Sequence, residues 1–276
     1  MSGNLYVVAT PIGNLEDLTP RARQTLADVD LVAAEDTRRT GRLLSHLGLK
    51  KRQMALHDHN EARVVTKLIA ALESGQSVAL VSDAGTPLVS DPGYRLVREA
   101  HRSGITVSPI PGASAVTAAL SAAGLPTDRF CFEGFLPAKS TARQARLAGL
   151  AHEPRTLVFF ESVHRIGDVL ADMSAAFGDG RLAFIGREMT KVYEQCEQAS
   201  LAALRASVAD DSIAGKGEFV IVVAGAERDS ETTFDIDRML TELAEYLPPK
   251  QAAELTSRLT GEKKNALYQR LLNIRE

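Results

Sequence analysis

The sequence predicts an α/β protein with two domains and a small helical module towards its C-terminal end. The first domain is expected to hold a parallel sheet, because short apolar runs alternate with helix-like segments between residues 5 and 123. The second is expected to hold a mixed sheet, because this pattern changes after residue 126. The module is expected because residues 235–276 show helical periodicity, interrupted at Pro248, Pro249 and Gly261.

The first domain carries clear helix start and stop signals. Thr19 stands before Pro20, which predicts an N-cap followed by proline at the first helical position. Gly48, Gly75 and Gly104 each follow a helix-like segment and are typical of helix ends. These signals place strands at residues 5–10, 30–34, 54–57, 78–81 and 105–109, and helices beginning at residue 20 and spanning residues 37–46, 60–75, 91–104 and 113–123.

Aromatic residues open the second domain, in the strand-like run FCFEGF at residues 130–135. We place the border between the two domains at residues 118 and 119, and the end of the second domain at residue 226. The polar tract 226–233 is expected to be a linker to the helical module. The remaining strands are expected at residues 156–160, 182–185, 192–198 and 219–223, and the helices at residues 141–150, 163–177 and 201–209.

The composition is that of an ordinary soluble globular protein. Of the 276 residues, 45% are hydrophobic and 24% are charged, and the net charge is −3. Proteins that simply wrap nucleic acid are usually basic, so any nucleic-acid contact here must depend on local patches. The two cysteines lack metal-ligand spacing, and neither a signal peptide nor a membrane-length apolar run is visible. A cytoplasmic location is therefore expected.

Three loops rich in small residues follow predicted strands of the first domain. They span residues 10–15, 82–87 and 111–115. In a parallel sheet, ligands bind at the carboxyl ends of the strands. We therefore expect the three loops to converge on one ligand crevice.

The residues of these loops indicate which ligand the crevice takes. The chain has neither the Gly-x-Gly-x-x-Gly nor the Walker pattern, so a phosphate cradle is not expected. Asp83 would repel a pyrophosphate, and a cationic or neutral ligand with hydroxyls and an adenine, such as S-adenosylmethionine, fits better. A second Ser-Asp turn at residues 90–93 is interpreted chiefly as a helix start.

Eight short motifs in this order resemble those of the tetrapyrrole methylase superfamily. Within it, the chain is most similar to the 16S rRNA cytidine 2′-O-methyltransferases, from residue 5 to residue 225 and on into their C-terminal extension. The motifs are PIGNLED (11–17), AEDTR (34–38), HDHNE (57–61), SDAGTP (82–87), PGASA (111–115), FESVHR (160–165), REMTK (187–191) and GEFV (217–220).

The resemblance implies that S-adenosylmethionine binds in a cleft between the two α/β domains. It also implies a homodimer, and 16S rRNA within the small ribosomal subunit as the partner, methylated on the ribose of a decoding-centre cytidine. No membrane contact is implied. The cofactor-binding residues that it implies are Pro11, Ile12, Asp83, Gly85, Thr86, Ser114, Ala115, Phe160, Glu218 and Phe219.

A ribose 2′-hydroxyl is a poor nucleophile, so a base or strict orientation must assist it. The sequence does not choose a base, and orientation alone is an alternative. Glu35 and Asp36 would also suit a pairing with Arg38 or Arg39 near a helix start. His57 and His59 have no evident third ligand, so no metal is expected. The candidate catalytic residues are Glu35, His59, Glu188 and Lys191.

Three other functions remain as alternatives. One is a related methylase that acts on a porphyrin-like ring or a protein side chain, and another is a non-catalytic RNA-binding protein. The third, a nucleotide-sugar or NAD enzyme, is opposed by the missing glycine fingerprint. Basic segments favour an RNA substrate through phosphate contacts. They lie at residues 38–42, 50–52, 139–146 and 263–264.

Overall fold

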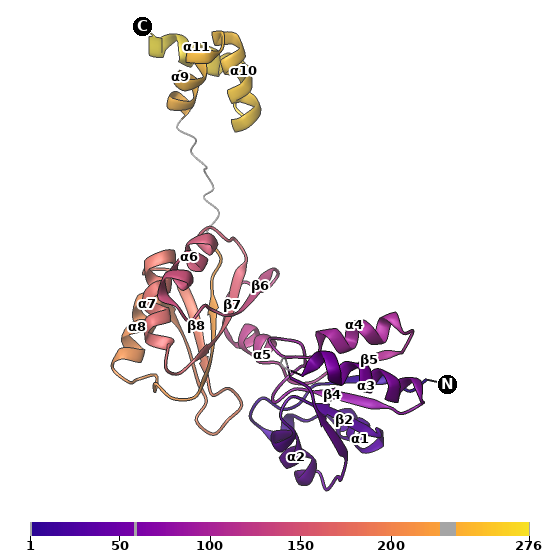
Figure 1. Cartoon of the computed structure of the whole chain (residues 1–276). Coiled ribbons are helices and arrows are strands. Elements are labelled where there is room, and N and C mark those ends of the chain that lie inside the picture. The colour runs from indigo at the N-terminus through magenta and orange to yellow at the C-terminus, as the bar shows by residue number, and fades with distance from the viewer. Residues whose placement is uncertain (1, 58–59, 227–235, 276) are drawn as a thin grey trace. The chain divides into compact units, whose positions relative to one another are not determined.

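The computed structural model describes residues 2–57, 60–226 and 236–275 of the chain (Figure 1). The chain divides into two compact units, residues 1–226 and residues 227–276. The first unit holds both sheets and the second holds three helices. The predicted linker at residues 226–233 lies, beyond its first residue, outside the described residues.

The first sheet is parallel, as predicted. Its strand order is β3-β2-β4-β1-β5, and every neighbouring pair runs in the same direction. The strands β4, β1 and β5 are therefore neighbours, and they are the strands that the three small-residue loops follow. The strands are β1 (Leu5–Val8), β2 (Leu31–Ala34), β3 (Arg52–Ala55), β4 (Val78–Val81) and β5 (Val107–Ile110).

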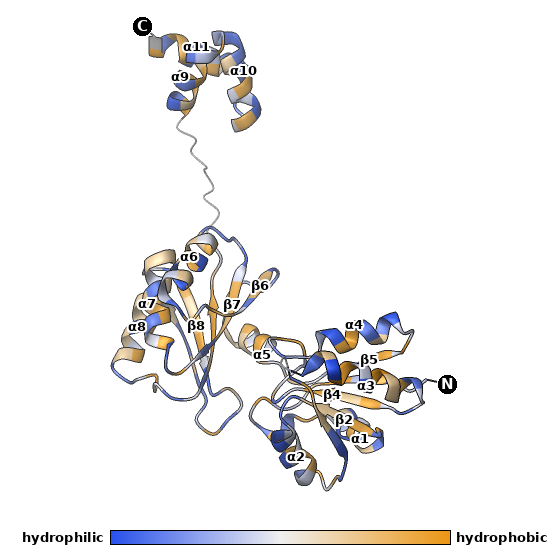
Figure 2. Cartoon of the chain, viewed as in Figure 1, coloured by the Kyte–Doolittle hydropathy of each residue, from blue (hydrophilic) through white to orange (hydrophobic). Residues whose placement is uncertain are grey.

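Helices cover both faces of this sheet (Figure 1), and residues of its strands join a separate apolar cluster on each face. Strand β4 is hydrophobic along its length (Figure 2). Thr19 caps the first helix as predicted, since its side chain accepts the N–H of Ala22 at 3.1 Å. The second helix is capped by Asp36 rather than Thr37, through the N–H of Arg38. The elements are η1 (Leu15–Asp17), α1 (Pro20–Asp28), α2 (Thr37–His46), α3 (Glu61–Glu73) and α4 (Tyr94–Arg102).

The start of α4 corrects one prediction. The helix begins at Tyr94, after the N-cap Gly93, and not at residue 91. The buried carboxylate of Glu61 accepts the N–H groups of Gly93 at 3.3 Å and Arg95 at 3.2 Å, which fixes the first turn there. The predicted start at residue 91 is therefore three residues too early: Gly93 of the second Ser-Asp turn is the N-cap, and Ser90 and Asp91 lie before the helix.

The second sheet is mixed, as predicted, with strand order β6-β7-β10-β8-β9. Strands β6 and β7 are parallel, and the other neighbouring pairs are antiparallel. Strand β9 begins at Gln195 rather than at residue 192, because residues 188–194 form a loop with positive φ at Glu188 and Thr190. The strands are β6 (Phe130–Phe135), β7 (Thr156–Ser162), β8 (Leu182–Arg187), β9 (Gln195–Ser200) and β10 (Glu218–Val223).

Helices α6 (Ser140–Leu150), α7 (Ile166–Phe177) and α8 (Leu201–Ala209) pack on one face of the second sheet. Helix α5 (Ala115–Ala122) packs on the other, where its residues Val116, Ala119 and Leu120 join the apolar cluster of β7, β8 and β10. The predicted border at residues 118 and 119 falls within α5, and the division of this unit into two domains stays a prediction.

The second unit consists of α9 (Ile236–Tyr246), α10 (Pro249–Thr260) and α11 (Lys264–Arg275). It has an apolar core of its own, formed by Leu240, Ala244, Ala252, Ala253, Leu267 and Leu271. The predicted breaks fall between its helices, since Pro249 is the first residue of α10 and Gly261 its C-cap in the left-handed conformation. Among the described helices of the whole chain, none combines the length and the apolar character needed to cross a membrane.

Candidate functional site

The three small-residue loops are joined to one another by hydrogen bonds. Thr10 and Gly85 exchange two backbone bonds, of 2.9 and 3.0 Å, which link the loop after β1 to the loop after β4. The hydroxyl of Thr86 donates to the carbonyl of Ala113 at 3.1 Å, which adds the loop after β5. Gly85 has a φ of +80°, a conformation that L side chains rarely adopt. The predicted convergence of the loops is therefore present.

A cavity of about 450 Å³ lies against these loops and is lined by residues of both sheets. Its size is typical of a site for a small molecule or cofactor. Eleven of the predicted site residues line it, namely Ile12, Glu35, Asp83, Gly85, Thr86, Ser114, Ala115, Phe160, Lys191, Glu218 and Phe219.

Two predicted residues lie elsewhere, and a third is not described. Pro11 lines a second cavity of about 300 Å³, which shares part of its wall with the first. Glu188 contacts Lys191 without lining either cavity. His59 lies outside the described residues.

One wall of the larger cavity is apolar. Phe160 of β7 meets Phe132 and Phe135 of β6 edge to face, with ring centroids 4.9 and 5.7 Å apart. Val89 and Met189 also line the cavity. Such a wall suits a flat ring system. Phe135, which the sequence predicts as part of a strand, is therefore also a site residue.

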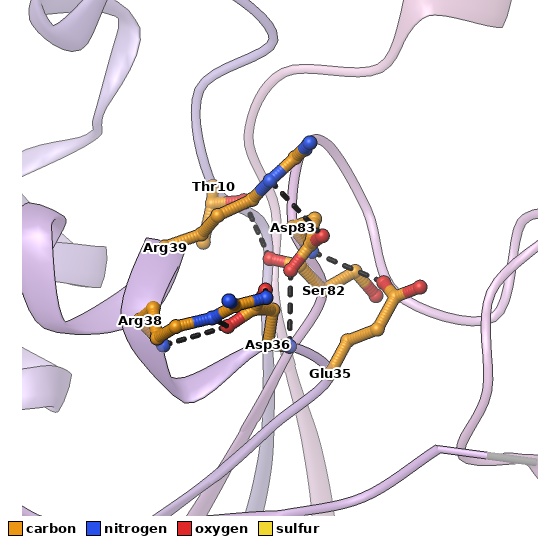
Figure 3. A network of polar contacts seen from close by, with 7 residues as sticks. All are labelled: Thr10, Glu35, Asp36, Arg38, Arg39, Ser82 and Asp83. Atoms are coloured by element: carbon orange, nitrogen blue, oxygen red, sulfur yellow. Dashed lines mark hydrogen bonds and ion pairs between the residues drawn. The ribbon is translucent and has the colours of Figure 1, made fainter.

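Asp83 is held by the start of α2. Its carboxylate accepts the N–H of Asp36 at 3.0 Å and lies 3.4 Å from Nε of Arg39 (Figure 3). Its own N–H donates to the carboxylate of Glu35 at 3.2 Å. Arg38 pairs instead with Asp36 at 2.7 Å. The expected pairing of Asp36 with arginine thus holds for Arg38, and Asp83 both lines the cavity and fixes the loop after β2.

Asp91 is a site residue that the sequence analysis missed. It lines the larger cavity together with Ser90, Glu35 and Asp83. Burial, with a smaller contribution from the charges of Glu35 and Asp83, raises the pKa of Asp91 to about 6. The repeated Ser-Asp pair is a sequence feature that could have indicated this role. Whether Asp91 faces the cavity, however, depends on where α4 begins.

Lys191 is the centre of an ion-pair network at the edge of both cavities. Its Nζ lies 2.8 Å from Glu188 Oε1 and 2.8 Å from Glu218 Oε2. Although burial opposes it, hydrogen bonding to both carboxylates raises the pKa of Lys191 above its usual value. Burial likewise opposes ionisation of Glu188, but hydrogen bonds from Lys191 and the Glu218 N–H hold its pKa below the usual value. Lys191 is therefore a cation and unsuited to be a base.

The acidic side chains of the site do not form a metal-binding cluster among the described residues. Within residues 2–57, 60–226 and 236–275, no group of three or more His, Cys, Asp or Glu side chains is arranged to hold a metal ion. The carboxylates of Glu35, Asp83 and Glu188 contact backbone N–H groups, Arg39 or Lys191.

Comparison with known proteins places the chain in a family. Residues 4–205 match the family model described as Tetrapyrrole (Corrin/Porphyrin) Methylases, and residues 231–275 match that of the RsmI C-terminal HTH domain. The chain belongs to the tetrapyrrole methylase family. This methylase is 52% identical to the ribosomal RNA small subunit methyltransferase I of Xylella fastidiosa (strain Temecula1), over 96% of this chain and 98% of that one. It is also 52% identical to the protein of the same name from Escherichia coli O157:H7, over 96% of this chain and 93% of that one. The resemblance inferred from the motifs is confirmed.

Solved structures share the fold of this tetrapyrrole methylase. The methyltransferase CobJ superposes with a TM-score of 0.61 at 23% identity, over 82% of this chain and 95% of that one. Uroporphyrin-III C-methyl transferase from Thermus thermophilus, complexed with S-adenyl homocysteine, superposes with a TM-score of 0.56 at 20% identity, over 80% of this chain and 97% of that one. The predicted fold class is thereby confirmed.

The Asp91→Asn variant is expected to be more stable than the native chain above pH 6. The pKa of Asp91 is about 6 in the folded chain, above its ordinary value of 3.8. The free energy of unfolding of the native chain therefore falls as the pH rises from 3.8 to about 6. The amide cannot ionise. Because solvent screens part of the charge on this half-buried group, we expect a gain of about 1 kcal/mol. Urea unfolding at about pH 7.5 and about pH 4 measures the gain, which should disappear at the lower pH. An equal difference at both pH values would show that ionisation of this carboxyl is not the cause.

Proposed function

We propose that this tetrapyrrole methylase transfers a methyl group from S-adenosylmethionine to the ribose 2′-oxygen of a decoding-centre cytidine in 16S rRNA. The observation that carries the proposal is the 52% identity, across almost the whole chain, to proteins named ribosomal RNA small subunit methyltransferase I. The small ribosomal subunit as substrate, a homodimer and a cytoplasmic location, all implied by the motif resemblance, are part of the same proposal.

The larger cavity supports S-adenosylmethionine as the cofactor. The apolar wall around Phe160 and Phe135 suits an adenine, and the carboxylates of Asp83 and Asp91 suit a ligand with cationic groups. Ser114 and Ala115 line this cavity on the side of the first sheet, and Glu218 and Phe219 line it on the side of the second sheet. When bound, this cofactor supplies an electrophilic methyl group on a positively charged sulfur.

The chain must also accept the proton that the 2′-hydroxyl loses. Lys191 is protonated, and Glu188 is paired with it without lining either cavity. Of the predicted catalytic residues that the structure describes, Glu35 is the carboxylate that lines the larger cavity. We assign it the role of proton acceptor and Lys191 that of orienting the acceptor strand.

The Ala115→Leu variant tests the cofactor site. Ala115 lines the cavity from the first turn of α5, so a larger side chain fills ligand space without disturbing helical backbone. We expect calorimetry to show at least a roughly tenfold loss of S-adenosylhomocysteine affinity, the equivalent of about 1.4 kcal/mol. Ala122→Leu, at an exposed position of the same helix that lines neither cavity, is the control. Unchanged affinity in Ala115→Leu would remove α5 from the site.

Methyl transfer from labelled S-adenosylmethionine to purified small ribosomal subunits tests the reaction. We expect one labelled nucleotide, a decoding-centre cytidine, at which the RNA resists alkaline cleavage. The resistance follows because a 2′-O-methyl ribose cannot form the 2′-alkoxide that cleaves the chain. Label on the base, or on a small molecule or protein instead of RNA, would contradict the proposal.

The Glu35→Gln variant accompanies that experiment. The amide oxygen still accepts the Asp83 N–H but cannot take a proton. Loss of a general base typically costs about a hundredfold or more in turnover, which we expect with little change in cofactor affinity. Native turnover in this variant would mean that orientation alone suffices.

The helical unit is proposed to help dock the rRNA. Lys250, Arg258 and Lys263 are exposed on it, and Tyr246 adds aromatic surface. A chain ending at Ala226 is expected to fold, because residues 1–226 are compact by themselves, and to bind the cofactor normally. Methylation of small subunits should fall roughly tenfold or more as phosphate contacts are lost. Full methylation would show that the unit is dispensable for docking, and loss of cofactor binding would make its role structural.

A further inference from the structure

The loop of residues 188–194, between β8 and β9, is firmly braced. Within it, Thr190 N–H donates to Glu194 Oε2 at 2.5 Å, and Lys191 N–H donates to the Glu188 carbonyl at 3.0 Å. The buried Arg187 donates from Nη1 to the Tyr193 carbonyl at 3.0 Å and to Gln195 Oε1 at 3.0 Å. The loop therefore has a fixed shape, imposed from both of its ends.

This braced loop holds two large apolar side chains in solvent. Val192 is 93% exposed and Tyr193 is 75% exposed. A single exposed apolar residue is ordinary, but two adjacent ones on a braced loop form a surface for contact with another molecule. Tyr193 adds a flat ring with a hydroxyl group, which suits contact with a partner that offers both a flat apolar surface and hydrogen-bonding groups or water.

The loop lies against the first-sheet side of the smaller cavity. Gly13 permits this contact, because a Cβ there would be 2.4 Å from Cγ of Lys191 and 2.8 Å from Oγ1 of Thr190. The cavity, of about 300 Å³, is lined by Gly13 and by the cations Arg39, Arg42 and Lys191. It shares Ile12, Asp83, Ala84, Arg39, Lys191 and Glu218 with the larger cavity.

We propose that the loop of residues 188–194 and the smaller cavity receive the unpaired target region of the RNA. The ring of Tyr193 stacks on a nucleobase, Val192 packs beside it, and Arg42 with Arg39 contacts the phosphates. Cations together with aromatic rings form the usual surface for single-stranded nucleic acid. Arg39 and Lys191 are paired with Asp83, Glu188 and Glu218, and Arg42 adds a further positive charge to the same cavity, which favours RNA over a second copy of the chain as the occupant. The shared wall with the larger cavity then puts the acceptor next to the methyl donor. This inference depends on the proposed function.

The Tyr193→Ala and Tyr193→Phe variants test the stacking. Loss of one base–aromatic stack weakens binding by roughly tenfold or more, so we expect that rise in Kd for small ribosomal subunits, and in KM, for Tyr193→Ala. Tyr193→Phe keeps the ring and should stay within about threefold of the native chain. Tyr94→Ala is the control, since Tyr94 is 64% exposed and lines neither cavity. Affinity for S-adenosylhomocysteine should not change in any of the three.

The Arg42→Gln variant tests the phosphate contact separately. Removing one such contact is expected to lower the slope of log Kd against log salt concentration by about one. Native Kd and KM in Tyr193→Ala, or an unchanged salt slope in Arg42→Gln, would overturn the proposal. So would light scattering that shows a dimeric native chain and a monomeric Tyr193→Ala, since the surface would then belong to a second copy. If small subunits bind with the expected differences but no methyl group is transferred, the proposed reaction fails while the RNA surface stands.

Discussion

The exchange of two backbone hydrogen bonds between Thr10 and Gly85 is the constraint on which the site depends. It joins the loops after β1 and β4, and the Thr86 hydroxyl extends the connection to the loop after β5. These loops meet because β4, β1 and β5 are neighbours in the sheet, although residues 8 and 78 are far apart in the chain. Small side chains there leave room for a ligand, and the positive φ of Gly85 lets the backbone turn into the crevice.

Helix α5 connects this edge of the first sheet to the second sheet. It starts directly after Ser114, which lines the larger cavity, and packs its apolar side chains on β7, β8 and β10. The same strands carry Phe160, Gly186 and Phe219 to the opposite wall. Residues 1–226 therefore form one compact unit, in which the cavity is closed by elements of both sheets. The predicted border at residues 118 and 119 lies within α5, and the division into two domains stays a prediction.

Several charged side chains of the site form ion pairs or hydrogen bonds with other residues of the chain. Asp83 is bound by Asp36 and Arg39, and Lys191 by Glu188 and Glu218. These contacts keep Lys191 protonated, whereas burial raises the pKa of Asp91. Asp91 favours a ligand with a positive charge in the larger cavity, whereas Arg42 lines the smaller cavity and adds a positive charge there. The proposed cationic methyl donor and anionic RNA would be bound on these two sides.

The sequence by itself determined both sheet types, the helical unit, the three converging loops and the family. Apolar periodicity, glycines at helix ends and the motifs around Asp83 are local patterns. Local patterns can be recognised in the sequence without knowledge of how the elements pack. Only the tertiary structure decided that Asp91 faces the cavity, because α4 starts at Tyr94 through N–H bonds to the distant Glu61. It alone showed that Lys191 is paired on both sides, that Thr190 and Lys191 approach Gly13, and that Val192 and Tyr193 of the same loop stand in solvent. These features arise from contacts between residues remote in the chain, which no local pattern encodes.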